Sequence, residues 1–428
     1  VPTWTMHKDD LPQAFKQRRG YDMMPYLPAT LGYIVSSVDD TNKFLRDLRQ
    51  TMADLYVDNF FDHFRTVAHD MGAKVYTEGA TGETLPGDPM RYYGVSDFPM
   101  TEFWYPKAPQ NQKEAKPIYA AASAYHLYNK PFLAAEAATQ LGVKWNESPK
   151  DIKYLINENF TKGVNHLVFH TFSHTPQVDV VPGSSFGGNI GFPFLRTQTW
   201  WRHTPTWIKS LARSQYLLQQ GEFVADVLWY LGDDLDRPPF DTHPFPQGYK
   251  FDYLNKELLQ EKVHVSNGQL YVEDAGKYKV IMLRDSQRML LSTAQKLKAL
   301  VEQGAVILGN KPETSPSLMD DAQDLSKLTQ IANQLWGDTN TGMRKVGKGK
   351  VYWGHTLPQV LNAEAIQPDV SFAKDLDLRW LHRSIGDTDV YYITNQLDKP
   401  IDASIRLRTA GAPPEIWNVD TGNTHVAP

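Results

Sequence analysis

Short apolar segments alternate with helical segments along residues 1–262, and this alternation most constrains the fold. Near-continuous apolar runs occur at 132–135, 166–169 and 223–230, while apolar residues recur at helical spacing through residues 41–71. Strands that are apolar on both faces and separated by helices are typical of a parallel sheet. We therefore predict an α/β fold in which residues 1–262 form a (β/α)8-type catalytic barrel, with about six of its eight strands recognisable.

The rest of the sequence predicts two smaller units. Residues 263–358 contain a strand at 277–283, then a helix at 292–303 and a second strand, which indicates a doubly wound, flavodoxin-like α/β domain. This unit has neither a dinucleotide-binding nor a phosphate-binding glycine motif, so we expect no nucleotide site there. Short alternating strands follow, and residues 359–428 are predicted to form a β-rich C-terminal domain, either a β-sandwich or a fragment of one.

The composition excludes several classes of protein. The chain has 428 residues and a formal charge of −5, and its Lys and Arg residues are scattered, so we expect no nucleic-acid partner. It contains no Cys, which excludes disulfides, a thiol nucleophile and a Cys-ligated zinc site. No apolar run approaches the roughly 18 residues that span a bilayer, so we expect no membrane span.

Glu102 is the first candidate for chemistry. It lies between Met100, Phe103 and Trp104, in a stretch that we predict to be a long loop from Gly79 to about residue 112. Apolar neighbours raise the pKa of a carboxyl group, and a general acid needs such a raised pKa to keep its proton near neutral pH. Glu102 could therefore be the general acid of a glycosidase, although a surface acid in a loop remains an alternative.

Asp233 is the second candidate. It follows the apolar run 223–230 and Gly232, and Asp234 stands next to it. Hydrolysis of a glycosidic bond uses two carboxyl groups, one of which stays ionised and activates water. Asp233 suits that general base in a polar setting, with Asp234 as a substrate ligand or the base itself. A helix N-cap is the alternative for Asp233.

Three further residues follow apolar strands. Glu136 ends the run at 132–135, where a carboxylate is costly unless it is paired or functional. His170 and His174 follow the run at 166–169. Their spacing suggests zinc, but a strand-to-loop segment lacks the helical geometry of a zinc motif. We expect both to bind sugar hydroxyls or to satisfy the core.

Aromatic residues are abundant, with 11 Trp, 21 Tyr and 19 Phe. Aromatic rings stack on the C–H faces of sugars, and the alternative is packing in a large core. We expect Trp104, Trp200 and Trp201 to bind substrate, with one of the adjacent pair also able to serve as a core residue.

A series of short motifs in a fixed order resembles glycoside hydrolase family 106, the α-L-rhamnosidases. The motifs span most of the chain and are Arg19-Gly20-Tyr21-Asp22, Asp97-Phe98-Pro99 before Glu102, Ala135-Glu136-Ala137, Gly163-Val164-Asn165, Phe169 to His174, Thr199-Trp200-Trp201, Ala225-Asp226-Val227 and Asp377 to Arg383.

The resemblance implies an inverting exo-hydrolase with a barrel catalytic domain, which removes terminal α-L-rhamnose from plant or algal glycans or glycosides and uses an active-site calcium. Glu102 would be the general acid and Asp233 the base, at a position where the family more often has Glu. Calcium prefers hard oxygen ligands, and Glu136 is the candidate ligand. We also expect a periplasmic or secreted protein.

Two other functions stay open. A related barrel glycosidase of another specificity, such as a β-galactosidase-like enzyme, would share the domain series. A catalytically weak carbohydrate-binding homologue would explain Asp in place of Glu at position 233, because a side chain one methylene shorter shifts the attacking water by about 1 Å or more.

Overall fold

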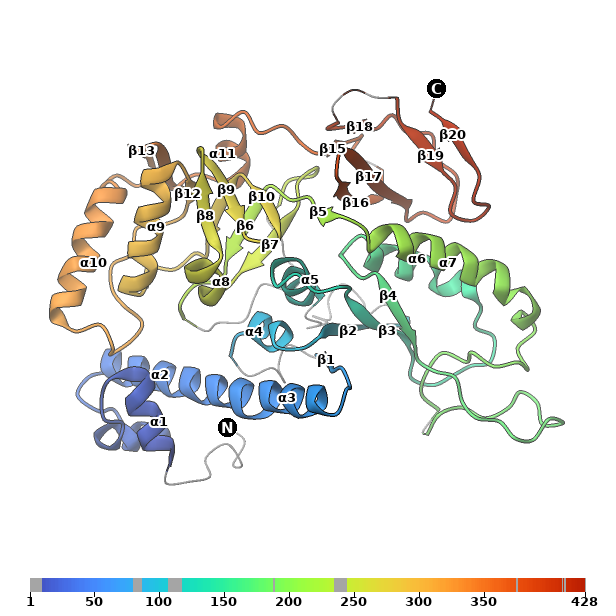
Figure 1. Cartoon of the computed structure of the whole chain (residues 1–428), viewed down its shortest axis with the longest axis horizontal. Coiled ribbons are helices and arrows are strands. Elements are labelled where there is room, and N and C mark those ends of the chain that lie inside the picture. The colour runs from blue at the N-terminus through green and yellow to red at the C-terminus, as the bar shows by residue number, and fades with distance from the viewer. Residues whose placement is uncertain are drawn as a thin grey trace.

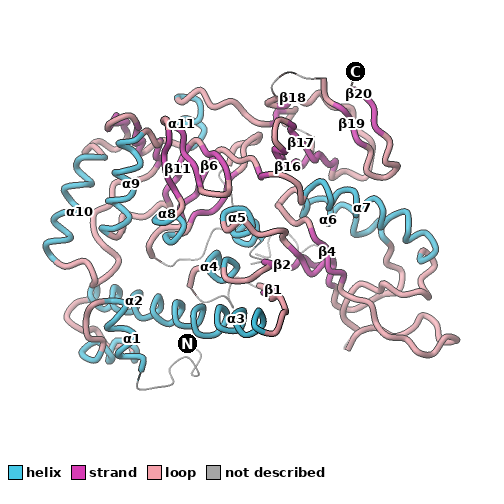
Figure 2. The backbone as a smooth tube through the Cα atoms, in the orientation of Figure 1, coloured by secondary structure: helices cyan, strands magenta, loops and turns pink. Residues whose placement is uncertain are grey.

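The computed structural model describes residues 10–79, 87–106, 118–187, 189–234, 245–374, 376–409, 411 and 413–427. Two groups of strands are separated by a central helix, with helices from the N-terminal region along one side and the C-terminal strands on the opposite side (Figures 1 and 2). None of the helices described is both long enough and apolar enough to cross a membrane.

The first sheet has four strands, all parallel, in the order β1-β2-β3-β4. Its strands and the helices that alternate with them are β1 (Tyr76–Glu78), α4 (Pro89–Gly94), β2 (Phe98–Trp104), α5 (Ile118–Leu127), β3 (Ala134–Thr139), α6 (Pro149–Phe160), β4 (His166–Phe169) and α7 (Thr204–Leu218).

Glu102 lies inside strand β2 and not in a loop, so the predicted loop from Gly79 to about residue 112 is wrong at that point. Pro99 and the dense aromatic residues resemble a loop in sequence, but β2 is a buried inner strand whose neighbours β1 and β3 supply its hydrogen bonds. The described part of the first sheet has four strands and is open, whereas we predicted an eight-stranded barrel.

The second sheet has six strands in the order β13-β14-β12-β11-β6-β7, all parallel except β13. Its strands are β6 (Val227–Tyr230), β7 (Phe251–Leu254), β11 (Val280–Leu283), β12 (Val306–Leu308), β13 (Gly342–Val346) and β14 (Gly349–Trp353).

Strands β6 and β7 belong to the second sheet, whereas we predicted both to be strands of the barrel of residues 1–262. An apolar run such as Val227–Tyr230 reports burial on both faces and does not identify the sheet that buries it. Without the antiparallel edge strand, the spatial order β7-β6-β11-β12-β14 is the flavodoxin-like order 2-1-3-4-5. The predicted domain boundaries at 262 and 358 stay predictions.

Helices and a small antiparallel sheet surround the second sheet. The helices are α8 (Lys256–Glu261), α9 (Leu291–Gln303), α10 (Ala322–Leu335) and α11 (Leu357–Ala363), and the small sheet comprises β8 (Val263–Ser266), β9 (Gln269–Val272) and β10 (Gly276–Tyr278).

Helix α5 joins the two sheets. All of its residues except Tyr119 are buried, and it packs against β2 on one side and β7 on the other. The Ser123 hydroxyl accepts the backbone N–H of Tyr253 at 2.8 Å, and His126 Nδ1 lies 2.8 Å from an Asp252 carboxylate oxygen. One hydrophobic core consequently contains residues of both sheets.

The N-terminal helices form a layer with its own small core around Phe15 and Phe44. They are α1 (Asp10–Arg19), a 3-10 helix (Met24–Leu31), α2 (Val38–Tyr56), a π-helical turn (Val57–Asp62) and α3 (His63–Asp70). The predicted helix over 41–71 is confirmed, and the Ser37 side chain caps its start by accepting the Asp40 backbone N–H.

The C-terminal strands form small sheets. They are β5 (Glu222–Phe223) with β16 (Leu378–Ile385) and β17 (Thr388–Asn395), β15 (Val370–Ser371) with β18 (Arg406–Leu407), and β19 (Glu415–Trp417) with β20 (Thr424–Val426). A β-rich C-terminal region was expected, and the described strands are antiparallel throughout.

Candidate active site

Three glutamates gather on one face of the first sheet. Glu102 and Glu136 stand opposite each other in the parallel pairing of β2 with β3, and Glu78 pairs with Met100 on the other side of β2. Successive side chains of a strand alternate between faces, so Met100 and Glu102 share a face and Glu78 joins them. Carboxylate oxygens of the three glutamates all lie within 4.8 Å of one another.

The surroundings of the cluster are polar on one side and apolar on the other. Glu102 is 4% exposed and sits between the buried residues Thr101 and Phe103, while Glu78 and Glu136 are half-buried. The Thr139 hydroxyl donates to the Glu136 carboxylate. Like charges at this distance repel each other, and a bound cation would offset that repulsion.

The cluster geometry fits a divalent cation. Calcium binds oxygen ligands at about 2.3–2.6 Å, so two ligands of one ion can lie at most about 5.2 Å apart. The 4.8 Å limit for the three carboxylates falls within that range. Glu136, the predicted calcium ligand, is therefore joined by Glu78 and Glu102 as groups that could hold an ion.

Glu78 is a site residue that we did not select from the sequence. The run 74–77 ends at Glu78 just as the run 132–135 ends at Glu136, so the same strand-end signal was present. Parallel neighbours carry such residues to one edge of a sheet, and applying the rule to every strand would have identified Glu78.

The predicted histidines lie beyond strand β4. His170 is half-buried, its Nδ1 has no hydrogen-bond partner among the described residues, and its ring lies 5.7 Å from that of Phe186. His174 is exposed. In the described part of the chain neither belongs to a cluster of three metal-ligating side chains.

The predicted tryptophans differ in their surroundings. Trp104 ends strand β2, two residues beyond Glu102, and is half-buried. Trp200 donates its indole N–H to the Glu147 carbonyl at 2.8 Å and packs near Phe192 and Phe194. The ring of Trp201 lies 6.3 Å from that of Trp200. Trp200 is thus held mainly by packing, which was the alternative for one of the adjacent pair.

Asp233 lies at the end of β6, in the second sheet, and its partners are protein groups. Its carboxylate accepts hydrogen bonds from the Tyr230 hydroxyl at 2.8 Å, the Thr293 hydroxyl at 3.1 Å and the Leu290 backbone N–H at 3.1 Å. Burial raises the pKa of Asp233, while Lys256 and these hydrogen bonds oppose the rise.

Leu290 is the N-cap residue of α9, so Asp233 ties strand β6 to the beginning of that helix. This role is structural, as the helix N-cap alternative would be, but Leu290 and not Asp233 is the N-cap residue of α9. Asp234 is buried as well, and its carboxylate pairs with Arg288 at 3.0 Å and accepts the Ser286 hydroxyl at 2.8 Å. Neither aspartate is a member of the glutamate cluster.

The model of glycoside hydrolase family 106, described as alpha-L-rhamnosidase, matches residues 2–427. The chain belongs to this family. The resemblance that the ordered motifs indicated is thereby confirmed over nearly the whole chain.

Two similar proteins are much longer. A Formosa agariphila protein named "Putative beta-glucuronidase" is 32% identical over 409 residues, which are 95% of this chain and 33% of that protein. The structure of a rhamnosidase from Novosphingobium sp. PP1Y, also 32% identical, superposes with a TM-score of 0.88 and covers 98% of this chain and 41% of that one. The family 106 chain thus spans well under half of either.

A β-galactosidase from Bacillus circulans sp. alkalophilus shares the fold at 12% identity, with a TM-score of 0.61 over 98% of this chain and 74% of that one. At this identity the likeness concerns the mixed α/β architecture alone.

Proposed function

We propose that this family 106 chain carries the acid-donating and substrate-binding part of an exo-acting glycoside hydrolase that removes terminal α-L-rhamnose from plant or algal glycans or glycosides. The observation that supports it most is the buried Glu102 in register with Glu136 on β3. A carboxyl group that is buried and surrounded by other carboxylates is suited to hold a proton near neutral pH.

Glu102 is the proposed proton donor. It is 4% exposed, and the buried Met100 lies on the same face of β2, so little water reaches its carboxyl group. In the reaction, Glu102 would transfer its proton to the glycosidic oxygen as the bond to the anomeric carbon breaks. The departing alcohol would then carry that proton, and Glu102 would be left as a carboxylate.

The second carboxyl group decides the stereochemistry. An inverting enzyme separates its two carboxyl groups by about 6.5–9.5 Å, whereas a retaining one separates them by about 5–5.5 Å. The carboxylate oxygens that approach one another in the glutamate cluster are closer than the inverting arrangement requires. An inverting reaction therefore needs a base outside the cluster. Asp233 stays the predicted base, and its three protein donors make a capping role the alternative.

A calcium ion is proposed to bind at Glu136 and Glu78, whose carboxylates supply the hard oxygen ligands it prefers. When bound, it would offset the repulsion within the cluster and orient sugar hydroxyls. Trp104, His170 and Trp201 are proposed to contact the sugar, with the buried Nδ1 of His170 as a group that needs a hydrogen-bond partner. A periplasmic or secreted location accords with a polymeric substrate.

The test is Glu102→Gln, assayed with an aryl α-L-rhamnoside, with Glu302→Gln on α9 as the control. We expect Glu102→Gln to lower kcat by about 10²–10⁴-fold and to unfold at the same temperature as wild type. Wild-type activity in Glu102→Gln would remove Glu102 from its role. NMR detection of the first anomer released would distinguish inversion from retention.

The specificity is tested separately. The Formosa relative bears the name of a glucuronidase, so an aryl β-D-glucuronide belongs in the panel together with an aryl β-D-galactoside. Turnover of the rhamnoside alone supports the proposal. Preference for either other glycoside would replace it with a different glycosidase, and binding without turnover of any would indicate a carbohydrate-binding homologue.

A further inference from the structure

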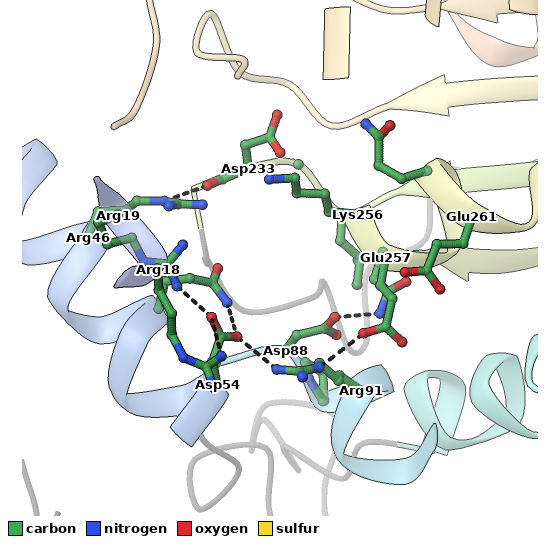
Figure 3. A pocket seen from close by; sticks show the side chains of 17 residues that line it. Arg18, Arg19, Arg46, Asp54, Asp88, Arg91, Asp233, Lys256, Glu257 and Glu261 are labelled. Carbon is green, nitrogen blue, oxygen red and sulfur yellow. Dashed lines mark hydrogen bonds and ion pairs between the residues drawn. The ribbon is translucent and has the colours of Figure 1, made fainter. Parts of the chain in front are cut away.

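A charged pocket lies apart from the glutamate cluster, at the junction of the N-terminal helices with the second sheet. Its volume is about 340 Å³, which is near the lower end of the range for small-molecule sites. Residues from α1, α2, α4, α8 and the end of β6 line it, and Figure 3 shows their side chains around a common space. None of Glu78, Glu102 and Glu136 is among them.

The lower wall of the pocket is a closed network of ion pairs. Arg91 pairs with Asp54 at 2.9 Å and with Glu257 at 3.0 Å, and Arg18 pairs with Asp58 at 2.8 Å. Arg19 pairs with Asp54 as well. The charges of these arginines are balanced by protein carboxylates, so this wall is a rigid support.

Lys256 is different, because its ammonium group has no hydrogen bond and no ion pair with any described residue. It begins helix α8 directly after the capping residue Asn255 and points into the pocket (Figure 3). Burial lowers the pKa of Lys256, and Arg46 and Arg19 lower it further, while Asp233 raises it.

The nearby groups leave the positive charge of Lys256 without a direct partner. Arg46 donates its Nε to the backbone carbonyl of Asp233 at 2.9 Å and its other end to Asp47 at 3.0 Å. The carboxylate of Asp233 is turned away from the pocket, toward Tyr230, Thr293 and Leu290 (Figure 3). A cation in such a partly dry setting gains from a counter-ion.

The other end of the pocket has the opposite character. Glu257 and Glu261 lie on the far side of Lys256 along α8 (Figure 3). Glu257 is already engaged by Arg91 and by the Tyr128 hydroxyl, so Glu261 is the main acceptor here for hydroxyl groups, and its charge would repel a second negative charge. A ligand that fits both ends has one anionic group and several hydroxyls.

The topology of the second sheet supports a ligand at this place. The chain passes from β6 to β7 on one side and then to β11 on the other side of β6. In open α/β sheets, ligands bind outside the carboxyl ends of the strands where the order reverses in this way. The pocket lies at the carboxyl ends of β6 and β7, where it includes Gly232, Asp233 and Asn255.

We propose that this pocket binds a small polyhydroxylated ligand with a single anionic group, either a sugar acid or a sugar monophosphate, through Lys256 and Arg46. The site shares no residue with the glutamate cluster, and Asp233, the predicted base, borders it through its backbone carbonyl. Binding at this site is measured without any turnover of a glycoside, so its failure is distinguishable from failure of the proposed function. A free regulatory ligand and an acidic sugar unit of an anionic glycan would both present one anionic group to Lys256 and Arg46.

The test is calorimetric titration of the whole chain with D-glucuronate, glucose 6-phosphate and D-glucose as the uncharged control. We expect both anions to bind and glucose to bind at least about tenfold more weakly, because it lacks the group that pairs with Lys256. Lys256→Met should lower the affinity for both anions by about tenfold or more, whereas Lys256→Arg should retain an affinity close to that of wild type.

Two controls keep the result interpretable. Lys298→Met removes a lysine of α9 outside the pocket and should leave binding unchanged, and Glu102→Gln should also bind as wild type. If Lys256→Met does not fold, Lys256→Gln replaces it. Equal binding of glucose and glucuronate, wild-type binding by the folded Lys256 variant, or the absence of any anion binding would overturn the proposal. If inorganic phosphate bound as tightly as glucose 6-phosphate, the hydroxyl groups would contribute nothing, and the proposal of a polyhydroxylated ligand would be overturned.

Discussion

Replacing Asp233 distinguishes a structural role from a catalytic one. Asp233→Ala removes the acceptor of three hydrogen bonds and leaves the Tyr230 hydroxyl, the Thr293 hydroxyl and the Leu290 N–H in a buried place. A hydrogen bond to a charged group contributes about 1.5–3 kcal/mol. The variant also removes the buried Asp233 charge and its desolvation cost, which offsets part of the loss of the three hydrogen bonds. We therefore expect the free energy of unfolding to fall by about 3 kcal/mol.

Asp233→Asn should lower the free energy of unfolding by less than Asp233→Ala. In Asp233→Asn the side-chain oxygen can still accept from Tyr230 and Thr293, but the amide nitrogen cannot accept the Leu290 N–H. We expect a loss of about 2 kcal/mol. The neighbouring Asp234→Asn is the matched control. It weakens an ion pair with the exposed Arg288, and we expect a loss of about 1 kcal/mol or less.

The assay combines two measurements. Urea unfolding followed by tryptophan fluorescence at pH 7 gives the stabilities, and amide hydrogen exchange gives the protection of the Leu290 N–H at the start of α9. Both should fall together in Asp233→Ala. A variant with wild-type stability and Leu290 protection that has lost hydrolysis of an aryl α-L-rhamnoside would refute the capping role and establish Asp233 as the base.

Two other predictions follow from the described contacts. Burial of the Lys250 ammonium, with Arg379 and Lys162 nearby, lowers its pKa to about 7. Between pH 7 and 10.5 the unfolded chain holds a proton on Lys250 that the folded chain lacks, so urea unfolding should show stability rising across this range, and Lys250→Met should make the rise smaller. Calcium should raise the unfolding temperature of wild type but not of Glu136→Gln. An equal rise in both would exclude Glu136 as a ligand.

Local patterns predicted the elements well where one physical cause dominates. Apolar residues at helical spacing located the helix of residues 41–71, because an amphipathic helix must bury one stripe. The strand with Glu136 was recognised for a similar reason, although it extends to Thr139 in the fold. A carboxylate in a buried strand is costly unless it is paired or functional, so such a residue can be selected from the sequence as a candidate site residue.

Features that depend on distant parts of the chain were not predictable. The segment around Tyr21 and Tyr26 is rich in aromatic residues, which favour strands, yet Met24–Leu31 is a 3-10 helix packed on Phe44. Two of the three partners of Asp233, Leu290 and Thr293, lie about 60 residues away, just before and on α9. Sequence alone indicated an acid after an apolar run, and only the fold identifies which donors surround it.

Helix α5 has a consequence for how this chain can evolve. Its alanines at positions 120, 121, 122 and 124 allow both sheets to approach it closely, and its polar residues Ser123 and His126 bond to strand β7. Neither sheet could be exchanged for a homologous unit without new residues on this helix. The two units are therefore expected to be inherited as a pair, and recombination that separates them should be rare among their descendants.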